Sequence, residues 1–431
     1  MTGAVAAEGF SDAACLIPGA LARGVNRCAP VGWPPRSAYL HIPFCHRRCF
    51  YCDFPVVPLG DRASAVPGAP GSASIQNYLQ LLHREIAAAP EGPPLSTVYI
   101  GGGTPSLLSA AQLGELLQAL RQRFGLVAGA EVSLELDPAS FDQARLAAYL
   151  AAGVNRVSLG GQSFSDVVLE QLGRRHRCRD LLEAAGWLQQ AQRSGRLQSW
   201  SLDLIQGLPG QTLPGWREQL EQALALQPPH LSVYDLIVEP GTVFERLEQR
   251  GALHLPESDL AADLMELTAR RLAASGYGHY EISNYALPGH ASRHNRVYWS
   301  GAGWWGFGMG ATSAPWGERL ARPRTREAYA AWVAQLKPQA ASAADLDTAG
   351  MPLDERWLVG LRRREGVALE APAELQQRLQ PFVEQGLLLR EGPRWRLSDP
   401  EGLALSNVVL RELLAWWDEQ GPGVADQPPN L

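Results

Sequence analysis

Three cysteines stand close together in the segment HIPFCHRRCFYCDF. Cys45, Cys49 and Cys52 follow the spacing C-x3-C-x2-C, and the other three cysteines of the chain are scattered. Thiolates bind soft metals and carry redox chemistry, whereas a chain of 431 residues can build its own core without disulfides. The cluster therefore predicts a metal or redox site in a reducing compartment, most simply the cytoplasm.

Three kinds of site could use these thiols. A structural zinc site takes four ligands, and no second cysteine pair follows, although His41 or His46 could complete the set. A thioredoxin-type pair would use Cys49 and Cys52 and would leave Cys45 unexplained. An iron–sulfur cube takes four thiolates, so three would leave one iron open to a small molecule. Because catalytic metal sites keep an open position, we favour the cube.

Short apolar runs alternate with helical patterns over about 240 residues after the cysteines. This alternation predicts a parallel sheet with right-handed crossovers, either closed partway into a barrel or left open as a doubly wound sheet. Two helices should begin at capping boxes, Ser109-x-x-Gln112 and Ser140-x-x-Gln143. The predicted strands are 38–44, 96–100, 131–136, 155–161, 199–205 and 231–237.

Several unusual residues fall at or near the ends of these predicted strands. The segment GGGTPS (101–106) follows the second strand, Glu135 lies in the apolar third strand, Gln162 follows the fourth, and Asp203 lies in the fifth. A glycine turn or a structural salt bridge would explain any one of them. A buried carboxylate is costly without a partner, and ligands bind at the carboxyl ends of parallel strands. Together with the cysteines, these residues predict one site at this edge.

Six motifs occur in an order that resembles a known family. The chain is similar to the coproporphyrinogen dehydrogenase-like branch of the radical SAM enzymes over about residues 39–417. The resemblance implies an α/β fold, a partial (βα)6 barrel followed by a C-terminal helical, winged-helix-like domain. It also implies S-adenosylmethionine (SAM) on the free iron, where one electron from the cluster would break the sulfonium bond and give a 5′-deoxyadenosyl radical, and it implies an electron donor for the cluster. The motifs are YLHIPFCHRRCFYCDF, GGGTPS, SLELDP, SLGGQSF, SLDLIQGLPGQT and LSVYDLIVEPGT.

The resemblance also implies roles for individual residues. The three cysteines would hold a [4Fe–4S] cluster, and Tyr39, Gly102 and Glu135 would bind the SAM on that cluster. In the dehydrogenases a second SAM is bound, and whether one binds here stays open. The positions that correspond to the second SAM site are Tyr51, Gly103, Thr104, Gln162, Arg174 (with Arg175 adjacent), Asp203 and Ile237.

Two functions compete within this branch. The dehydrogenases oxidatively decarboxylate two propionates and resemble C-x3-C-x2-C-x-C, whereas this chain has Phe54 at the fourth cysteine position, as in the HemW heme chaperones. The segment HNRVYW (294–299) resembles the HNxxYW motif of the same chaperones and makes His294 a candidate heme ligand. We therefore expect heme binding and transfer to an unidentified acceptor protein. A coproporphyrinogen III dehydrogenase, or another SAM enzyme acting on a tetrapyrrole, stays the alternative.

The amino-acid composition argues against several other classes of protein. Hydrophobic residues make up 46% of the chain and charged residues 19%, with a net charge of −6, which is typical of a globular protein and does not favour nucleic-acid binding. The winged-helix-like part also carries more acidic than basic residues. No apolar run is long enough for a transmembrane segment, and the start lacks the layout of a secretory signal.

The predicted organisation has three parts. Residues 1–37 should form a loose extension, 38–345 the barrel and its extension, and 346–431 the C-terminal domain. That domain should contain two helices, a hairpin turning at Glu391–Gly392–Pro393, and a final helix.

Overall fold

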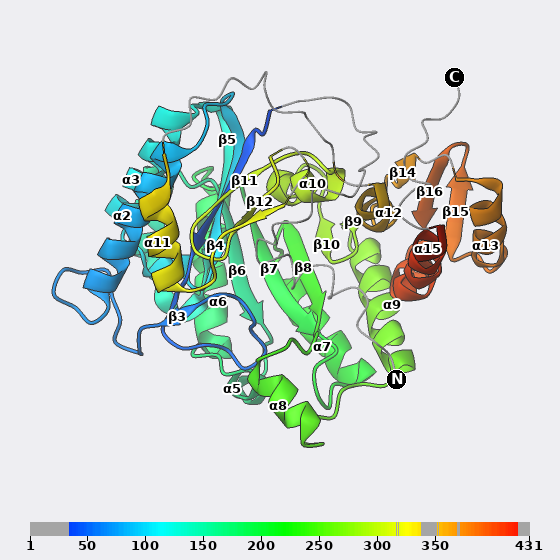
Figure 1. The fold of residues 1–431 in the computed structure, drawn as a ribbon. Coiled ribbons are helices and arrows are strands. Elements are labelled where there is room, and N and C mark those ends of the chain that lie inside the picture. The colour runs from blue at the N-terminus through cyan, green and yellow to red at the C-terminus, as the bar shows by residue number, and fades with distance from the viewer. Residues whose placement is uncertain are drawn as a thin grey trace.

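A computed structural model describes residues 34–315, 317, 319–337, 351, 353–368 and 371–420. Its main sheet has nine strands in the order β11-β1-β4-β5-β6-β7-β8-β10-β9. The six consecutive strands from β1 to β8 in that order are parallel, and they curve around a common interior, which confirms the predicted partial barrel (Figure 1). They are β1 (Ser37–Ile42), β4 (Leu95–Gly102), β5 (Leu126–Leu136), β6 (Arg156–Gln162), β7 (Ser199–Gln206) and β8 (His230–Asp235).

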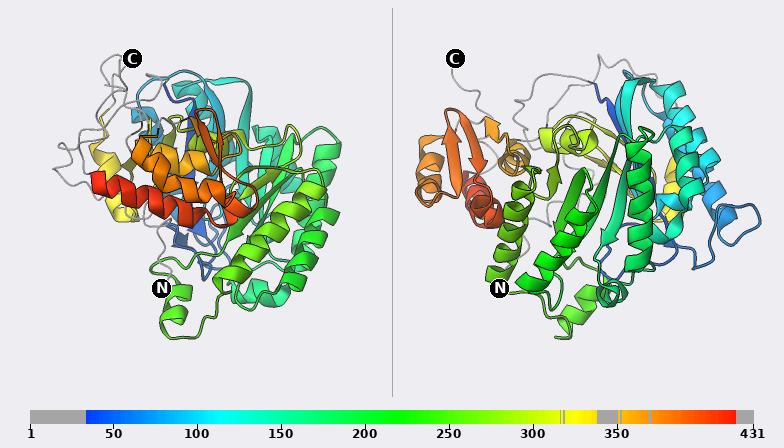
Figure 2. Two further views of the ribbon diagram at one scale, coloured as in Figure 1. Left: turned by 90° about the vertical axis from the view of Figure 1, so that its right-hand side faces the viewer. Right: turned by 180° about the vertical axis from the view of Figure 1, so that it is seen from behind.

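Crossover helices cover the outer face of the sheet (Figure 2). The capping box predicted at Ser109 is present on α3, but the one predicted at Ser140 is wrong, because Ser140 lies in a short 3-10 turn and Asp142 caps α4 instead. None of the described helices is long and apolar enough to cross a membrane. The helices of this part are α2 (Ser72–Ala88), α3 (Ala110–Arg123), α4 (Gln143–Ala152), α5 (Asp166–Gln171), α6 (Cys178–Arg193), α7 (Leu213–Ala225), α8 (Val243–Gln249) and α9 (Ser258–Ala274).

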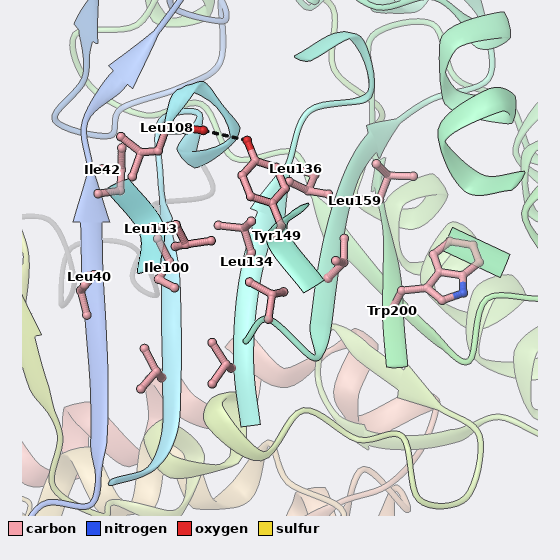
Figure 3. Close-up of a cluster of buried hydrophobic side chains, with 14 of the residues drawn as sticks. Leu40, Ile42, Ile100, Leu108, Leu113, Leu134, Leu136, Tyr149, Leu159 and Trp200 are labelled. Atoms are coloured by element: carbon pink, nitrogen blue, oxygen red, sulfur yellow. Dashed lines mark hydrogen bonds between the residues drawn. The ribbon is translucent and has the colours of Figure 1, made fainter. Parts of the chain in front are cut away.

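The two faces of the barrel strands differ in chemistry because successive side chains point to opposite sides. Outward residues such as Leu40, Leu134 and Trp200 are fully or almost fully buried against the helices, and Tyr149 of α4 donates a hydrogen bond to the Leu108 carbonyl (2.8 Å) at this layer (Figure 3). Inward residues are mostly polar or aromatic: Tyr39, Tyr99, Glu131, Glu135, Arg156, Ser158, Ser201, Asp203 and His230. The hydrophobic core therefore lies between sheet and helices, and the barrel interior is left for polar side chains.

An extension after α9 covers the amino-terminal end of the barrel, the end opposite the cysteines. Arg156, at the start of β6, donates to the carbonyl of His290 (3.0 Å), and β11 returns to pair with β1. The elements are β9 (Gly278–Glu281), β10 (Asn284–Ala286), α10 (Arg293–Ser300), β11 (Trp305–Phe307), β12 (Thr312–Ser313), β13 (Leu320–Ala321) and α11 (Arg326–Gln335).

The C-terminal part has a small sheet, β14-β16-β15, and its own hydrophobic cluster around Trp357, Leu375 and Trp395. The predicted hairpin is confirmed, and the predicted final helix is divided near Leu405 into two. The predicted domain bounds stay predictions, and most of the 1–37 extension lies outside the described residues. The elements are α12 (Leu353–Leu361), β14 (Val367–Ala368), α13 (Ala373–Glu384), β15 (Leu388–Glu391), β16 (Arg394–Leu397), α14 (Glu401–Ala404) and α15 (Ser406–Gln420).

Candidate functional site

A hollow of about 450 Å³ opens at the carboxyl ends of the barrel strands. The three cysteines lie on its wall together with nearly all of the residues predicted to bind SAM. Tyr39 does not line the hollow, and neither does His294, the predicted heme ligand. The predicted residues that do line it are Cys45, Cys49, Tyr51, Cys52, Gly102, Gly103, Thr104, Glu135, Gln162, Arg174, Asp203 and Ile237.

The cysteine loop is held by main-chain hydrogen bonds across its base. Cys45 ends β2 (Phe44–Cys45), which pairs with β3 (Val57–Pro58), and the Leu59 amide donates to the Cys45 carbonyl (2.8 Å). All three are free cysteines. Burial raises the pKa of Cys45 to about 12 and that of Cys52 to about 11, so these bare thiols keep their protons at neutral pH. A bound metal would have to displace the protons to take thiolate ligands.

The residues beside the sulfurs fit a cluster better than a single ion. A side chain at Gly103 would place its Cβ 2.7 Å from both the Cys45 sulfur and the Phe44 carbonyl oxygen, so glycine lets the GGGTPS turn pack directly against the cysteine loop, and Gly102 has a φ of 120° that favours glycine. Among the described residues, no three His, Cys, Asp or Glu side chains converge on one metal-ion position. In a [4Fe–4S] cube each thiolate binds a different iron, so the sulfurs need not converge. The three thiols therefore fit a cube, whereas the two histidines that could complete a zinc site, His41 and His46, instead contact the carbonyls of Pro55 and Gly60.

A buried ion pair carries a positive charge to the cysteine loop. Arg174 donates to Asp137 (2.7 Å) and to the Gly160 carbonyl (2.9 Å), and its other guanidinium nitrogen lies 3.6 Å from the Cys49 sulfur. Burial would raise the pKa of Asp137, but the Arg174 guanidinium, together with His176, lowers it. The neighbouring Arg175 pairs with the exposed Asp61 instead (3.3 Å), so Arg174 is the arginine that reaches the cysteines.

Glu135 projects into the hollow from β5, and none of the basic side chains in the described part of the chain forms an ion pair with it. It accepts hydrogen bonds from the Gly102 amide (3.0 Å) and the Tyr99 hydroxyl (2.9 Å). Burial raises the pKa of Glu135 to about 7, while these two donors lower it. The group can therefore change charge near neutral pH and accept hydrogen bonds from a cationic or amino group of a ligand.

The opposite wall is polar at its base and apolar at its rim. Asp203 accepts hydrogen bonds from Ser158 (2.7 Å) and Ser201 (3.2 Å), and burial raises its pKa. At the rim, Phe54 is 51% exposed and Ile237 is 47% exposed. A ligand bound at the base would thus meet carboxylates and cysteines, and its outer part would meet apolar side chains.

His294 lies at the other end of the barrel, away from the cysteines. Its ring is fully buried, with Nδ1 2.8 Å from the Thr97 hydroxyl and Nε2 2.8 Å from the Tyr298 hydroxyl. The ring stacks on Tyr99, which also stacks on Tyr39. The Tyr39 hydroxyl meets Nδ1 of His41 at 3.0 Å, so Tyr39 lies in the barrel interior beneath the hollow.

Comparison with known proteins places the chain in a family. The family model of the Radical SAM superfamily matches residues 39–223. A heme chaperone HemW of Synechocystis sp. is 39% identical over 89% of this chain and 98% of its own length. A heme chaperone HemW of Escherichia coli is 35% identical over 87% of this chain and 97% of its own length. The chain belongs to the HemW family.

A solved structure supports the fold of this HemW family member. Coproporphyrinogen III oxidase (HemN) of Escherichia coli, described as a radical SAM enzyme, covers 88% of this chain with a TM-score of 0.68. At 23% identity this likeness concerns the fold alone. It agrees with the partial barrel and the C-terminal part, and membership of a radical SAM family implies a [4Fe–4S] cluster and SAM as cofactors.

Sequence reasoning missed two residues of the site in this HemW family member. Asp137 follows β5 in the motif SLELDP and holds Arg174, and its position directly after a strand was a signal that could have found it. Tyr99 faces inward from β4 and contacts both Glu135 and His294. The alternation of β4 gives its direction, but only the register with β5 places it beside Glu135.

Proposed function

We propose that this protein is a heme chaperone that carries a SAM-binding [4Fe–4S] cluster and passes heme to an acceptor protein. The observation that carries the proposal is the match, over nearly the whole chain, to proteins named heme chaperone HemW. Phe54 supports it, because an exposed aromatic side chain stands at the rim where the dehydrogenases have a further cysteine.

The residues of the hollow would divide the cofactor binding between them. Cys45, Cys49 and Cys52 would ligate three irons, and Glu135 and the Gly102 backbone would bind the SAM on the fourth. When bound, the cluster and SAM supply one-electron chemistry. Tyr39 would act from beneath, through its contact with Tyr99. The second predicted set, Tyr51, Gly103, Thr104, Gln162, Arg174, Asp203 and Ile237, surrounds the remaining space in the hollow.

His294 is the proposed heme ligand, and its surroundings define how it would bind. The Thr97 hydroxyl at Nδ1 fixes the orientation of the ring, because a metal-ligating histidine is commonly held by a hydrogen bond at its other ring nitrogen. Nε2 would be the nitrogen that takes the iron, and the Tyr298 hydroxyl would have to leave it. Because the ring is buried, heme ligation also requires α10 to move relative to the barrel end.

Two partners and a location complete the proposal. An acceptor protein would receive the heme, and an electron donor would reduce the cluster. We propose the cytoplasm as the location, because the clustered thiols need a reducing compartment to stay free.

Anaerobic reconstitution followed by two parallel assays tests the function. The protein is titrated with heme, and it is separately incubated with coproporphyrinogen III, SAM and a reductant. We expect a heme absorbance band that saturates and no decarboxylated product. Turnover of the porphyrinogen without heme uptake would replace the proposal with the dehydrogenase.

A further inference from the structure

Helix α10 presents two different faces. His294 and Tyr298, four residues apart, point into the end of the barrel. Arg293, Arg296 and Trp299 line a separate hollow on the outside of the helix. The histidine and the tryptophan of the HNRVYW motif thus lie on opposite faces of the helix. The outer face takes no part in the site at the carboxyl ends of the barrel strands.

The outer hollow lies at the seam between the barrel end and the C-terminal part. It has a volume of about 290 Å³, and its far wall comes from Tyr280 and Glu281 of β9 and from Arg363 and Glu365 after α12. Arg363 forms a main-chain bridge with Glu281, and α10 contacts α12, so both walls are fixed to each other (Figure 1). The size is at the lower limit of ligand pockets and would accept one edge of a flat ligand.

Basic side chains converge on this hollow. Glu365 pairs with both Arg296 (2.5 Å) and Arg363 (3.7 Å), so two guanidinium groups already hold one carboxylate. The Arg296 side chain is 51% exposed and the Glu365 side chain 40% exposed, and an ion pair this exposed contributes little to the stability of the fold. An incoming carboxylate could therefore replace Glu365 at a small cost in free energy. Arg293 donates to the carbonyls of Gly129 and Ser96, contacts that leave its positive charge in place.

The carboxylate of Glu281 opposes these charges only in part. Burial raises its pKa to about 7, while hydrogen bonds from Asn284 and from the Ser283 amide lower it. Near neutral pH the hollow therefore keeps an excess of positive charge over negative. Trp299 adds a partly exposed indole to the same wall, and indole faces pack against flat aromatic ligands.

We propose that the hollow outside α10 binds the carboxylate-bearing edge of a porphyrin, with the propionates on Arg296 and Arg363 and the ring against Trp299. This inference rests on the proposed heme-chaperone function and adds to it the side chains that recognise the propionates. Arginine suits this role because its planar fork matches a carboxylate with two parallel hydrogen bonds. The described wall of this hollow contains no histidine, so His294 on the inner face of α10 can ligate the iron of the same heme only after the movement of α10 that ligation requires.

The test separates propionate recognition from heme binding as a whole. The reconstituted full-length protein is titrated with ferric heme and with ferric heme dimethyl ester, whose propionates are esterified, in the same buffer. The variants are Arg296→Gln, Arg363→Gln and Arg296→Lys. Arg217→Gln, an exposed arginine on α7, is the matched control. Cluster absorbance and SAM affinity verify that each variant is folded.

We expect each glutamine variant to bind heme roughly tenfold more weakly, as the loss of a charge-assisted hydrogen bond predicts, and to bind the ester as the wild type does. Arg296→Lys should recover part of the heme affinity, and the control should change neither ligand. Equal heme affinity in the wild type and both glutamine variants would overturn this inference alone. A wild type that binds no heme would overturn it together with the proposed function.

Discussion

The two ends of the barrel use their sequence motifs in different ways. At the mouth, residues far apart in the sequence meet around one hollow, because the register of parallel strands brings their carboxyl ends to the same edge. At the closed end, neighbouring residues of one motif separate, because successive helical residues point in different directions. His294 turns inward and Trp299 lines the outer hollow. Position at the ends of parallel strands therefore predicts a shared site even for residues far apart in the sequence, whereas proximity within one helix does not.

A column of aromatic rings connects the two ends. His294 stacks on Tyr99, Tyr99 stacks on Tyr39, and the Tyr99 hydroxyl donates to Glu135 at the mouth. The two ends of the barrel are therefore connected by packed side chains, although the mouth would bind SAM and the other end would bind heme. The following experiments ask whether the two ends can be altered independently.

The largest expected effect comes from removing the cysteines at the mouth. Replacing Cys45, Cys49 and Cys52 together with alanine should abolish the visible absorbance of the reconstituted cluster and SAM binding with it. Heme affinity at the other end should stay within about twofold, because no heme contact of the proposal involves these residues. Absorbance spectra and heme titrations of the same preparations measure both.

Cys178→Ala is the matched control for the triple variant. Cys178 begins α6 and does not line the hollow, so its loss should leave the cluster absorbance unchanged. Retention of the cluster in the triple variant would contradict the ligand set. A triple variant that loses heme binding as well would contradict the separation of the two ends.

The sequence predicts the mouth better than the closed end for a physical reason. The cysteines and Glu135 could be predicted because thiol spacing and a carboxylate in an apolar strand each have few explanations, and strand alternation fixes the direction of Glu135. Tyr99 and Asp137 acquire their roles only through partners on other elements. For His294, the motif indicates the residue type, but the packing of α10 against β4 and β5 decides which way the ring points.

The next effect concerns His294 itself. His294→Ala should weaken heme binding by at least roughly tenfold and shift the heme absorbance band, because an axial ligand is lost. His290→Ala is the matched control, since its ring lies just before α10 and its Nδ1 lies 3.0 Å from the Ser199 hydroxyl. An unchanged heme spectrum and affinity in His294→Ala would show that the ligand assignment is wrong.

Tyr298→Phe tests the role of the His294 Nε2 atom while the histidine side chain stays in place. If Nε2 takes the iron, removing the hydroxyl that now contacts it should tighten heme binding about threefold to tenfold, the value of one hydrogen bond. Heme titration followed by absorbance measures the change. Weaker binding would indicate that the hydroxyl supports the heme site rather than competing with it.

Tyr99→Phe tests the aromatic column at the point where it contacts Glu135 at the mouth of the barrel. The Tyr99 hydroxyl favours the ionised form of Glu135, whose pKa is raised to about 7, so Tyr99→Phe should raise that pKa further. If ionised Glu135 binds the amino group of SAM, affinity increases as pH rises through about 7. The variant should shift this midpoint upward and weaken SAM binding at pH 7 roughly fivefold, because a rise of about one pKa unit lowers the ionised fraction of Glu135 from about one half to about one eleventh.

The pH profile distinguishes this role from simple packing. The other titratable groups around Glu135 are Asp203, Tyr39 and Tyr298. Tyr149→Phe is the control, because it removes a buried hydroxyl from the outer layer of the barrel. Equilibrium dialysis with labelled SAM between pH 6 and pH 9 should show a shift only for Tyr99→Phe. A uniform loss of affinity at all pH values would mean that Tyr99 does not act through Glu135.

The smallest effect belongs to Glu131, which holds the start of α10. Its two carboxylate oxygens accept hydrogen bonds from the backbone amides of His294 and Arg293, both at 3.0 Å. Glu131→Gln keeps the shape, loses one acceptor and removes the charge that favours a helix N-terminus, a change of about 0.3–1 kcal/mol. Heme affinity should rise about twofold to fivefold, because heme ligation requires α10 to move from the barrel end and a less tightly held helix moves at lower cost, and SAM affinity should not change.

Heme and SAM titrations of the same Glu131→Gln preparation measure both affinities. Glu115→Gln is the control, because it removes one exposed negative charge from α3. A loosened α10 that changed SAM affinity as much as heme affinity would mean that the aromatic column transmits the disturbance to Glu135. The barrel would then bind its two ligands as one coupled system, since a coupling free energy between two binding sites acts equally in both directions. If only heme binding responds, the column supports the barrel interior without linking the two sites.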